Sequence, residues 1–290
     1  MSINKQPIAE TELILTGDKR VYHINLKDED IADDVIVVGD QGRVAQISSF
    51  FSKIEFKTEH REFVTHTGIY NGKRITVLST GIGTDNIDIV MNELDALANI
   101  DLKTRTIKSN FSKLKIIRIG TAGSLQRDVE LDSFVSTSYG IGLDSLMFYY
   151  EINYLDFMVQ ILKDFYRHMD EYAMLMRCYI SSGSIPMLEK FIDVSQLGIT
   201  VTCTGFYGPQ GRQLRGKNSV NDFAKRLSTF NAGMNRILNF EMETAGIYGM
   251  ANLLGHEAIS LSAIVANRIE NKFSKDGNAT VERLIKTVLE

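Results

Sequence analysis

The sequence predicts an α/β fold in which a largely parallel or mixed sheet is covered by helices on both faces. Two observations lead to this prediction. Short β-branched runs that end in glycine recur along the chain, and apolar residues with helical spacing lie between them. Strands that alternate with helices favour such a sheet, because each connecting helix packs on one of its faces.

Four runs have the composition of buried strands. They are DVIVVGD at 34–40, RITVLSTGIG at 74–83, KIIRIGTAG at 115–123 and AISLSAIVANR at 258–268. In open α/β sheets a ligand binds beyond the ends of the strands. The glycines and charged residues that follow these runs therefore fall where a ligand is expected.

Four further stretches have the apolar spacing of helices. They are 87–97, which follows the capping candidates Thr84 and Asp85, 155–166, 244–254, which stops at Gly255, and the C-terminal 281–290. These stretches supply the helices that alternate with the predicted strands.

Length and composition predict one domain. The chain has 290 residues, 44% of them hydrophobic, and no repeat or Pro/Gly-rich linker divides it. We expect a single domain over 1–290, with 1–20 as an N-terminal extension. The net charge of −4 lacks the basic excess that non-specific nucleic-acid binding needs, so any bound phosphate is expected to be small.

The cysteine pattern and the N-terminal segment indicate the cellular compartment in which the protein is expected. Cys178 and Cys203 are the only cysteines, without CxxC or histidine-rich spacing, which predicts neither a disulfide framework nor a metal site and fits a reducing cytosol. The N-terminal segment is polar, and no stretch approaches the roughly 20 apolar residues of a membrane span. We expect a cytoplasmic protein with neither membrane nor nucleic-acid partners.

The segment STGIGTDN contains glycines that could suggest a dinucleotide loop. The pattern GxGxxG is absent, because Gly81 and Gly83 are followed by Asp85 and Asn86. A nicotinamide-binding fold is therefore rejected. The glycines are expected to permit close packing where the strand meets its helix.

Two motifs at strand ends suit an oxyanion. In VVGDQGRV, the backbone at Gly39 and the side chain of Arg43 follow an apolar strand. The alternative is an ordinary tight turn with a solvated arginine.

In IIRIGTAG, the second motif, Arg118 lies inside an apolar strand and Thr121 follows a glycine. A buried arginine must meet an anion, which is either a charged ligand or the carboxylate of a structural ion pair.

The loop TGFYGPQGRQLR can recognise a flat polar ring. Gln210 offers a donor and an acceptor, Arg212 offers only donors, and Phe206 and Tyr207 stand beside them. This combination suits a pyrimidine edge. The alternative is a surface loop whose polar residues face water.

The segment NFEMETAGIYGM places two carboxylates where a core begins. Leu238, Phe240 and Met242 alternate as in a strand, and helical periodicity follows, so Glu241 and Glu243 are predicted at a strand-to-helix junction with their side chains on one face. A carboxylate can accept hydrogen bonds from the two hydroxyls of a ribose diol. The alternative, a glutamate favoured by the helix dipole, explains one of the two carboxylates.

Taken together and in the order in which they occur along the chain, the motifs resemble those of the nucleoside phosphorylases of the uridine and purine type. The likeness runs from about Tyr22 to the C-terminus and rests on YHINL, VVGDQGRV, HREF, STGIG, RIGTAGSLQ, FYGPQGR, NFEMET and VANR. It implies a three-layer α/β/α sandwich with a mixed central sheet. It also implies that two subunits share each active site, in a homodimer or a hexamer built from dimers. Residues 100–114 look like an insertion.

The resemblance also implies roles by position. Phosphate would be bound by Gly39, Arg43, Arg118 and Thr121, with Arg61 from the neighbouring subunit. Ribose would be bound by Met242 and Glu243, with His23 from the partner. Phe206, Gln210, Arg212, Glu241 and Arg268 would surround the base, and the catalytic residues would be Arg43, Arg118 and Arg212.

The resemblance further indicates which base is bound. Purine-type members have an aspartate after the last core strand, whereas this chain has Ala266, Asn267 and Arg268 there. Uracil is therefore favoured, and the implied reaction is phosphorolysis of uridine by a pentosyltransferase with phosphate as co-substrate and no cofactor. The alternatives are a purine nucleoside phosphorylase, a nucleosidase that uses water, and a nucleoside-binding protein without turnover.

Overall fold

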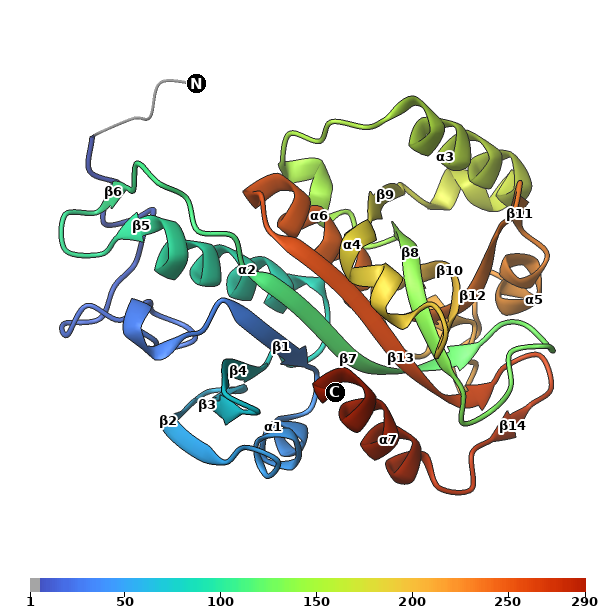
Figure 1. The fold of residues 1–290 in the computed structure, drawn as a ribbon. Helices are drawn as coiled ribbons and strands as arrows, with labels where there is room; N and C mark the ends of the chain where they lie inside the picture. Colours follow the sequence, from blue (N-terminus) through green and yellow to red (C-terminus); the bar gives the residue numbers. More distant parts are fainter. Residues whose placement is uncertain (1–5) are drawn as a thin grey trace. The chain divides into compact units, whose positions relative to one another are not determined.

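The computed structural model describes residues 6–290 (Figure 1). The chain forms two compact units, a first that runs to Ile117 and includes Leu254–Glu257, and a second of Arg118–Leu253 with Ala258–Glu290. The predicted single domain stays a prediction. Residues 1–5 of the predicted N-terminal extension lie outside the described residues.

The first unit is built on a mixed sheet with the order β1-β4-β3-β2. The strands are β1 (Asp34–Val38), β2 (Lys53–His60), β3 (Phe63–Tyr70) and β4 (Lys73–Ser79). β1 and β4 are parallel, and β4, β3 and β2 follow in antiparallel pairs. The apolar runs predicted at 34–40 and 74–83 are thus confirmed as strands up to Val38 and Ser79, and the glycines that follow lie in the turns.

Two helices of the first unit follow β1 and β4, namely α1 (Gln41–Ser48) and α2 (Thr84–Asn99), and a short 3-10 helix, η1 (Asp28–Asp30), precedes β1. α2 buries the predicted apolar positions, but its N-cap position is Gly83, so the prediction that Thr84 or Asp85 caps it was wrong. Gly83 has a φ of 99° and Gly81 a φ of 69°, values that L side chains rarely adopt. The glycines thus allow the turn itself.

The predicted insertion at 100–114 forms a hairpin of β5 (Ile100–Asp101) and β6 (Thr106–Ile107). Arg105 lies in its turn, and the Arg105 side chain donates hydrogen bonds to the carbonyl oxygens of Ile8, Ala9 and Leu13. The hairpin therefore fixes the segment that leads to Tyr22 and His23.

The second unit contains a mixed sheet with the order β11-β12-β10-β8-β13-β7. Its strands are β7 (Lys115–Ser124, from Arg118 in this unit), β8 (Phe134–Gly142), β9 (Tyr179–Ser182), β10 (Gln196–Thr202), β11 (Asn231–Ala232), β12 (Asn235–Glu241), β13 (Glu257–Asn267) and β14 (Lys272–Phe273). β10 is parallel to β8 and β12, whereas β13, β9 and β14 add antiparallel pairs.

The helices of the second unit are α3 (Asp156–Met169), α4 (Ile185–Leu188), α5 (Phe223–Ser228), α6 (Thr244–Leu254) and α7 (Gly277–Leu289), with short 3-10 helices η2 (Leu146–Tyr149), η3 (Asp170–Leu175), η4 (Glu189–Phe191) and η5 (Gly208–Gln210). α6 has the predicted bounds. α7 begins before the predicted 281 because Asp276 accepts a hydrogen bond from the amide of Ala279. Within residues 6–290, no helix is long and apolar enough to cross a membrane.

Candidate active site

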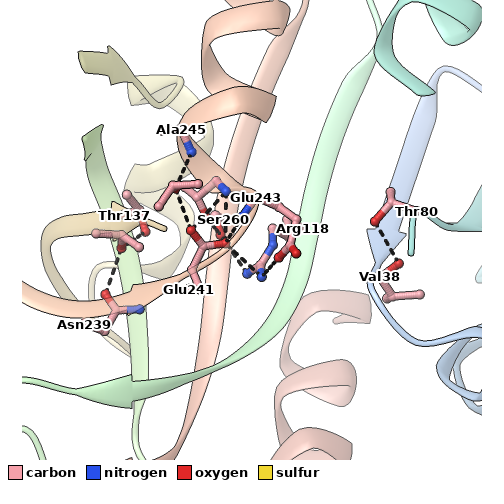
Figure 2. Close-up of polar contacts among 12 residues, drawn as sticks. Val38, Thr80, Arg118, Thr137, Asn239, Glu241, Glu243, Ala245 and Ser260 are labelled. Carbon is pink, nitrogen blue, oxygen red and sulfur yellow. Dashed lines mark hydrogen bonds and ion pairs between the residues drawn. The ribbon is translucent and has the colours of Figure 1, made fainter. Parts of the chain in front are cut away.

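The junction between β12 and α6 brings Arg118, Glu241 and Glu243 together in the second unit. Arg118 Nη2 lies 2.6 Å from Glu243 Oε2 and 2.9 Å from Glu241 Oε2 (Figure 2). Glu241 ends β12 and Glu243 immediately precedes α6. Both carboxylates reach one guanidinium nitrogen, which confirms that they lie on the same side of a strand-to-helix junction.

Glu241 has protein partners for both carboxylate oxygens. Oε1 accepts a hydrogen bond from the hydroxyl of Thr202 at 2.6 Å, and Oε2 accepts from the amides of Glu243 and Thr244 at 2.8 and 2.9 Å. A carboxylate that binds the first amides of a helix satisfies donors that have no partner within the helix. The helix-dipole alternative therefore accounts for Glu241, and it leaves Glu243 as the carboxylate to consider for a ligand.

Arg118 is buried and charged. Burial lowers the pKa of its guanidinium, but the charges of Glu241 and Glu243 outweigh burial and raise that pKa above its usual value. A Cβ atom at Gly120 would lie 2.0 Å from Arg118 Nη1, so the guanidinium is folded against the bare backbone of this glycine. The structural ion pair, one of the two alternatives for Arg118, is present.

The neighbouring candidates Thr121 and Met242 are half-buried, on β7 and between the two glutamates. Arg118 Nη1 donates to the hydroxyl oxygen of Ser260 on β13 at 3.4 Å. Thr121 and Met242 are neighbours of this group in the sequence and belong to the same unit.

A second group of candidates gathers at the 203–212 loop. The Arg212 Cζ atom lies 3.7 Å from the centre of the Phe206 ring, and Arg212 Nη1 donates to Gln210 Oε1 at 2.5 Å and to the Phe206 carbonyl at 2.6 Å. Gln210 is buried. Arg212 therefore links the other two predicted base contacts of this loop, and the surface-loop alternative is wrong for the buried Gln210.

Arg268 joins this group from the end of β13. It donates to the Gln210 carbonyl at 3.3 Å, and its Cζ atom lies 5.2 Å from the centre of the Phe240 ring. Burial and then the charge of Arg268 lower the pKa of Arg212 to about 10, and burial lowers the pKa of Arg268. Two half-buried guanidinium groups whose charged forms are disfavoured by burial suit a ligand that carries electron-rich oxygens.

In the first unit, Gly39 and Arg43 lie where β1 ends and α1 begins. Asp40 caps α1 by accepting a hydrogen bond from the Gly42 amide at 3.0 Å. Thr80, which follows β4, donates its hydroxyl to the Val38 carbonyl at 3.3 Å (Figure 2). Its amide donates to the same carbonyl at 2.7 Å. A Cβ atom at Gly39 would stand 3.4 Å from the Gly81 carbonyl, so the ends of β1 and β4 pass close to each other.

His23 and Arg61, the two residues expected to serve a neighbouring subunit, also lie together in the first unit. Arg61 is exposed in the turn between β2 and β3, and its Cζ atom is 5.5 Å from the centre of the Tyr22 ring. His60 Nδ1 donates to the His23 carbonyl at 2.8 Å. The two predicted contributions thus come from one surface region.

The predicted phosphate-binding residues are divided between the units. Gly39, Arg43 and Arg61 belong to the first, and Arg118 and Thr121 belong to the second. Their convergence on one anion stays a prediction. Among residues 6–290, no group of three His, Cys, Asp or Glu side chains could hold a metal ion.

Glu93 is a further residue of this region that the sequence does not predict. It lies on α2 and accepts hydrogen bonds from the backbone of His23 and Ile24 and from the His23 ring. Glu93 stands at the edge of the apolar stripe of α2, where a solvated glutamate would also stand. The sequence therefore carries no local signal for its role.

Comparisons with known proteins cover almost the whole chain. Residues 33–290 match the phosphorylase superfamily. A uridine phosphorylase of Thermococcus kodakarensis is 31% identical over 262 residues, which are 90% of this chain and 83% of that protein. A DeoD-type purine nucleoside phosphorylase of Buchnera aphidicola is 27% identical over 272 residues, 92% of this chain and 97% of that protein.

Among solved structures, the chain is similar to a Trypanosoma brucei nucleoside phosphorylase described as showing uridine phosphorylase activity. The two align with a TM-score of 0.87 and 28% identity over 96% of this chain and 98% of the other. This match, with the mixed pairing of the strands, confirms the predicted nucleoside phosphorylase-like α/β fold.

Proposed function

Because the chain belongs to the phosphorylase superfamily, we propose that it catalyses the phosphorolysis of uridine to uracil and ribose 1-phosphate. The observation that carries the proposal is the buried pair of Arg118 and Glu243, 2.6 Å apart. This pair supports the proposal because a guanidinium suits phosphate and a carboxylate suits the ribose diol. The relatives from Thermococcus kodakarensis and Trypanosoma brucei support uridine as the substrate.

The phosphate is bound, in this proposal, by Gly39, Arg43, Arg118 and Thr121, with Arg61 supplied by a second copy of the chain. Arginine suits this task because its planar fork matches the oxygens of phosphate. The proximity of Arg61 to the segment that carries His23 supports a shared contribution from one neighbour. The assembly is then a homodimer or a hexamer built from dimers.

The ribose is held by Glu243 and Met242 of one copy and by His23 of the other. The Glu243 carboxylate accepts hydrogen bonds from the 2′- and 3′-hydroxyls, and Met242 packs against the sugar. Since the diol is bound by Glu243, the hydroxyl that remains for His23 is the 5′-hydroxyl.

In the reaction, a phosphate oxygen forms a bond to C1′ while the bond from C1′ to N1 of uracil breaks. The electron pair of the broken bond leaves with uracil, which takes a proton from water, and the sugar passes through a state with oxocarbenium character. Arg212 and Gln210 donate hydrogen bonds to the uracil oxygens, where negative charge develops. These contacts are stronger in the transition state than in the substrate and therefore accelerate the reaction.

The end of β13 supports uracil over a purine. Asn267 stands near the position at which purine-type members have an aspartate, and its amide is engaged in the local loop. Its Nδ2 donates to the Gln126 carbonyl at 2.8 Å, and its Oδ1 accepts from the amides of Ile269 and Glu270. An amide at this position cannot supply the proton that a purine ring needs as it leaves.

A substrate panel with purified protein tests the proposal. We expect loss of uridine absorbance and formation of ribose 1-phosphate that require inorganic phosphate and no added cofactor. Preference for inosine or adenosine would make the protein a purine nucleoside phosphorylase. Release of uracil without phosphate would make it a nucleosidase, and binding without turnover would make it a binding protein. Cytoplasmic location stays a prediction.

A further inference from the structure

Glu93 makes hydrogen bonds to His23, the predicted ribose ligand, and to the residue that follows it. Its Oε1 lies 2.6 Å from His23 Nδ1, and its two oxygens accept the amides of His23 at 3.0 Å and of Ile24 at 2.8 Å. The side chain of Glu93 is 13% exposed and that of His23 is 28% exposed. A carboxylate 70 residues away in the sequence thus holds both the backbone and the ring of His23.

These contacts select one tautomer of the imidazole. A carboxylate oxygen accepts hydrogen bonds, so Nδ1 of His23 carries a proton toward Glu93. In the neutral ring, Nε2 is then an acceptor with a lone pair. The amides of His23 and Ile24 bind the same carboxylate and restrict its rotation, while His60 Nδ1 donates a further hydrogen bond to the His23 carbonyl.

We propose that Glu93 is a positioning residue for ribose binding, which holds His23 in the tautomer with a proton on Nδ1 and presents Nε2 to the 5′-hydroxyl of the nucleoside. The inference rests on the proposed function, in which His23 serves the active site of a second copy of the chain. A hydrogen-bonded carboxylate behind a histidine fixes the tautomer and orientation of its ring in many protein sites. Glu93 acts only through His23 and contacts no substrate.

The variant Glu93→Gln tests this role because it keeps the size of the side chain. A glutamine has one carboxamide oxygen, which cannot replace both carboxylate oxygens, and its NH2 group repels one of the donors. We expect the kcat/KM for uridine to fall about 10–100-fold, chiefly through KM. The kcat/KM for 5′-deoxyuridine, which lacks the hydroxyl, should change by less than about 3-fold, because the pair then has no partner on the substrate.

His23→Ala provides the second arm. It should discriminate between uridine and 5′-deoxyuridine in the same way, and the double variant should be no less active than His23→Ala alone, since the residues act as a unit. Glu12→Gln is the matched control, because Glu12 is exposed and lies in the same N-terminal segment. It should leave both substrates unaffected. Equal losses on both substrates in Glu93→Gln, no loss on either, or a further loss in the double variant would overturn the proposal.

A measurement of the tautomer separates this inference from the proposed function. In protein with 15N-labelled histidine, the His23 signals, identified by their absence in His23→Ala, should report a proton on Nδ1 in the wild type. They should report a mixture of tautomers in Glu93→Gln. An unchanged tautomer in Glu93→Gln contradicts the role of Glu93 even if uridine is phosphorolysed. A wild type that lacks phosphate-dependent activity contradicts the proposed function instead.

Discussion

The guanidinium of Arg118 and the carboxylate of Glu243 form an ion pair at 2.6 Å in which each side chain is 8% exposed. The pair joins β7 to the start of α6, 125 residues away in the sequence. The contact with Glu243 involves only Nη2 of Arg118, and an arginine has five N–H donors. Arg118 can therefore bind a further anion while it stays paired with Glu243. The same residue can thus stabilise the fold and bind phosphate.

The ion pair of Arg118 should contribute substantially to the stability of the fold. Arg118→Ala leaves Glu241 and Glu243 buried without their cation, and breaking a buried pair on one side costs about 3–5 kcal/mol. We expect the free energy of unfolding, measured in urea, to fall by about this amount. Arg215→Ala is the control, since Arg215 is exposed and should change stability by less than about 0.5 kcal/mol. Equal stability of the two variants would show that the carboxylates do not need the arginine.

A single methyl group at Gly120 should displace Arg118 without removing it. The new Cβ atom would stand 2.0 Å from Arg118 Nη1 and 2.5 Å from its Cζ atom, so the guanidinium must leave its present position beside Glu243. Gly120→Ala is expected to cost about 1–3 kcal/mol of stability and to raise the KM for phosphate. Gly216→Ala, where nothing lies within 4 Å of the added atom, is the matched control. A normal KM for phosphate in Gly120→Ala would argue against Arg118 as a phosphate ligand.

Arg212 should affect turnover as well as affinity. Its guanidinium stacks on Phe206 and binds Gln210, which orients its remaining donors. If it stabilises the charge that develops on uracil, Arg212→Ala lowers kcat about 10²–10³-fold, as the loss of one donor to an oxyanion does elsewhere. Steady-state kinetics with uridine measure this, with Arg215→Ala as a control from the same loop. A change in KM alone would limit Arg212 to substrate binding.

The junction that carries the two glutamates could be predicted from the sequence because local patterns encode it. The alternation of Leu238, Phe240 and Met242 is a strand pattern, and the helical pattern that follows begins where α6 begins, at Thr244. The arginine inside a strand likewise showed that an anion must be close. Which anion it was depends on the pairing of distant strands, and this information is not local.

The support of His23 could not be predicted for the same reason. Glu93 and His23 are 70 residues apart, and the hydrogen bonds between them require the N-terminal segment to lie against α2. No periodicity marks a loop that packs on the edge of a helix. The N-cap of α2 was predicted wrongly for a related reason. Thr84 and Asp85 have a high propensity for the N-cap position, but the helix begins after Gly83, whose φ of 99° the sequence does not reveal.

His66 should make the stability of the protein depend on pH. It lies on β3, is buried, and its Nδ1 is 2.7 Å from the Ser48 hydroxyl, which itself donates to the Ala45 carbonyl. Burial, and secondarily the charge of Lys57, lower the pKa of His66 below the usual 6.5. The native state therefore binds this proton less readily than the unfolded chain does.

The sign of the effect follows from that difference. Above pH 6.5 the imidazole is neutral in both states, and its contribution to stability is fully present. As the pH falls below 6.5 the unfolded chain takes up the proton first, so stability decreases until the lowered pKa of the native state is passed. The slope for one proton is at most about 1.4 kcal/mol per pH unit. Urea unfolding at pH 7.5 and 5.5 should show a larger loss in the wild type than in His66→Gln. Equal losses would mean that His66 is protonated as easily in the native state as in the unfolded chain.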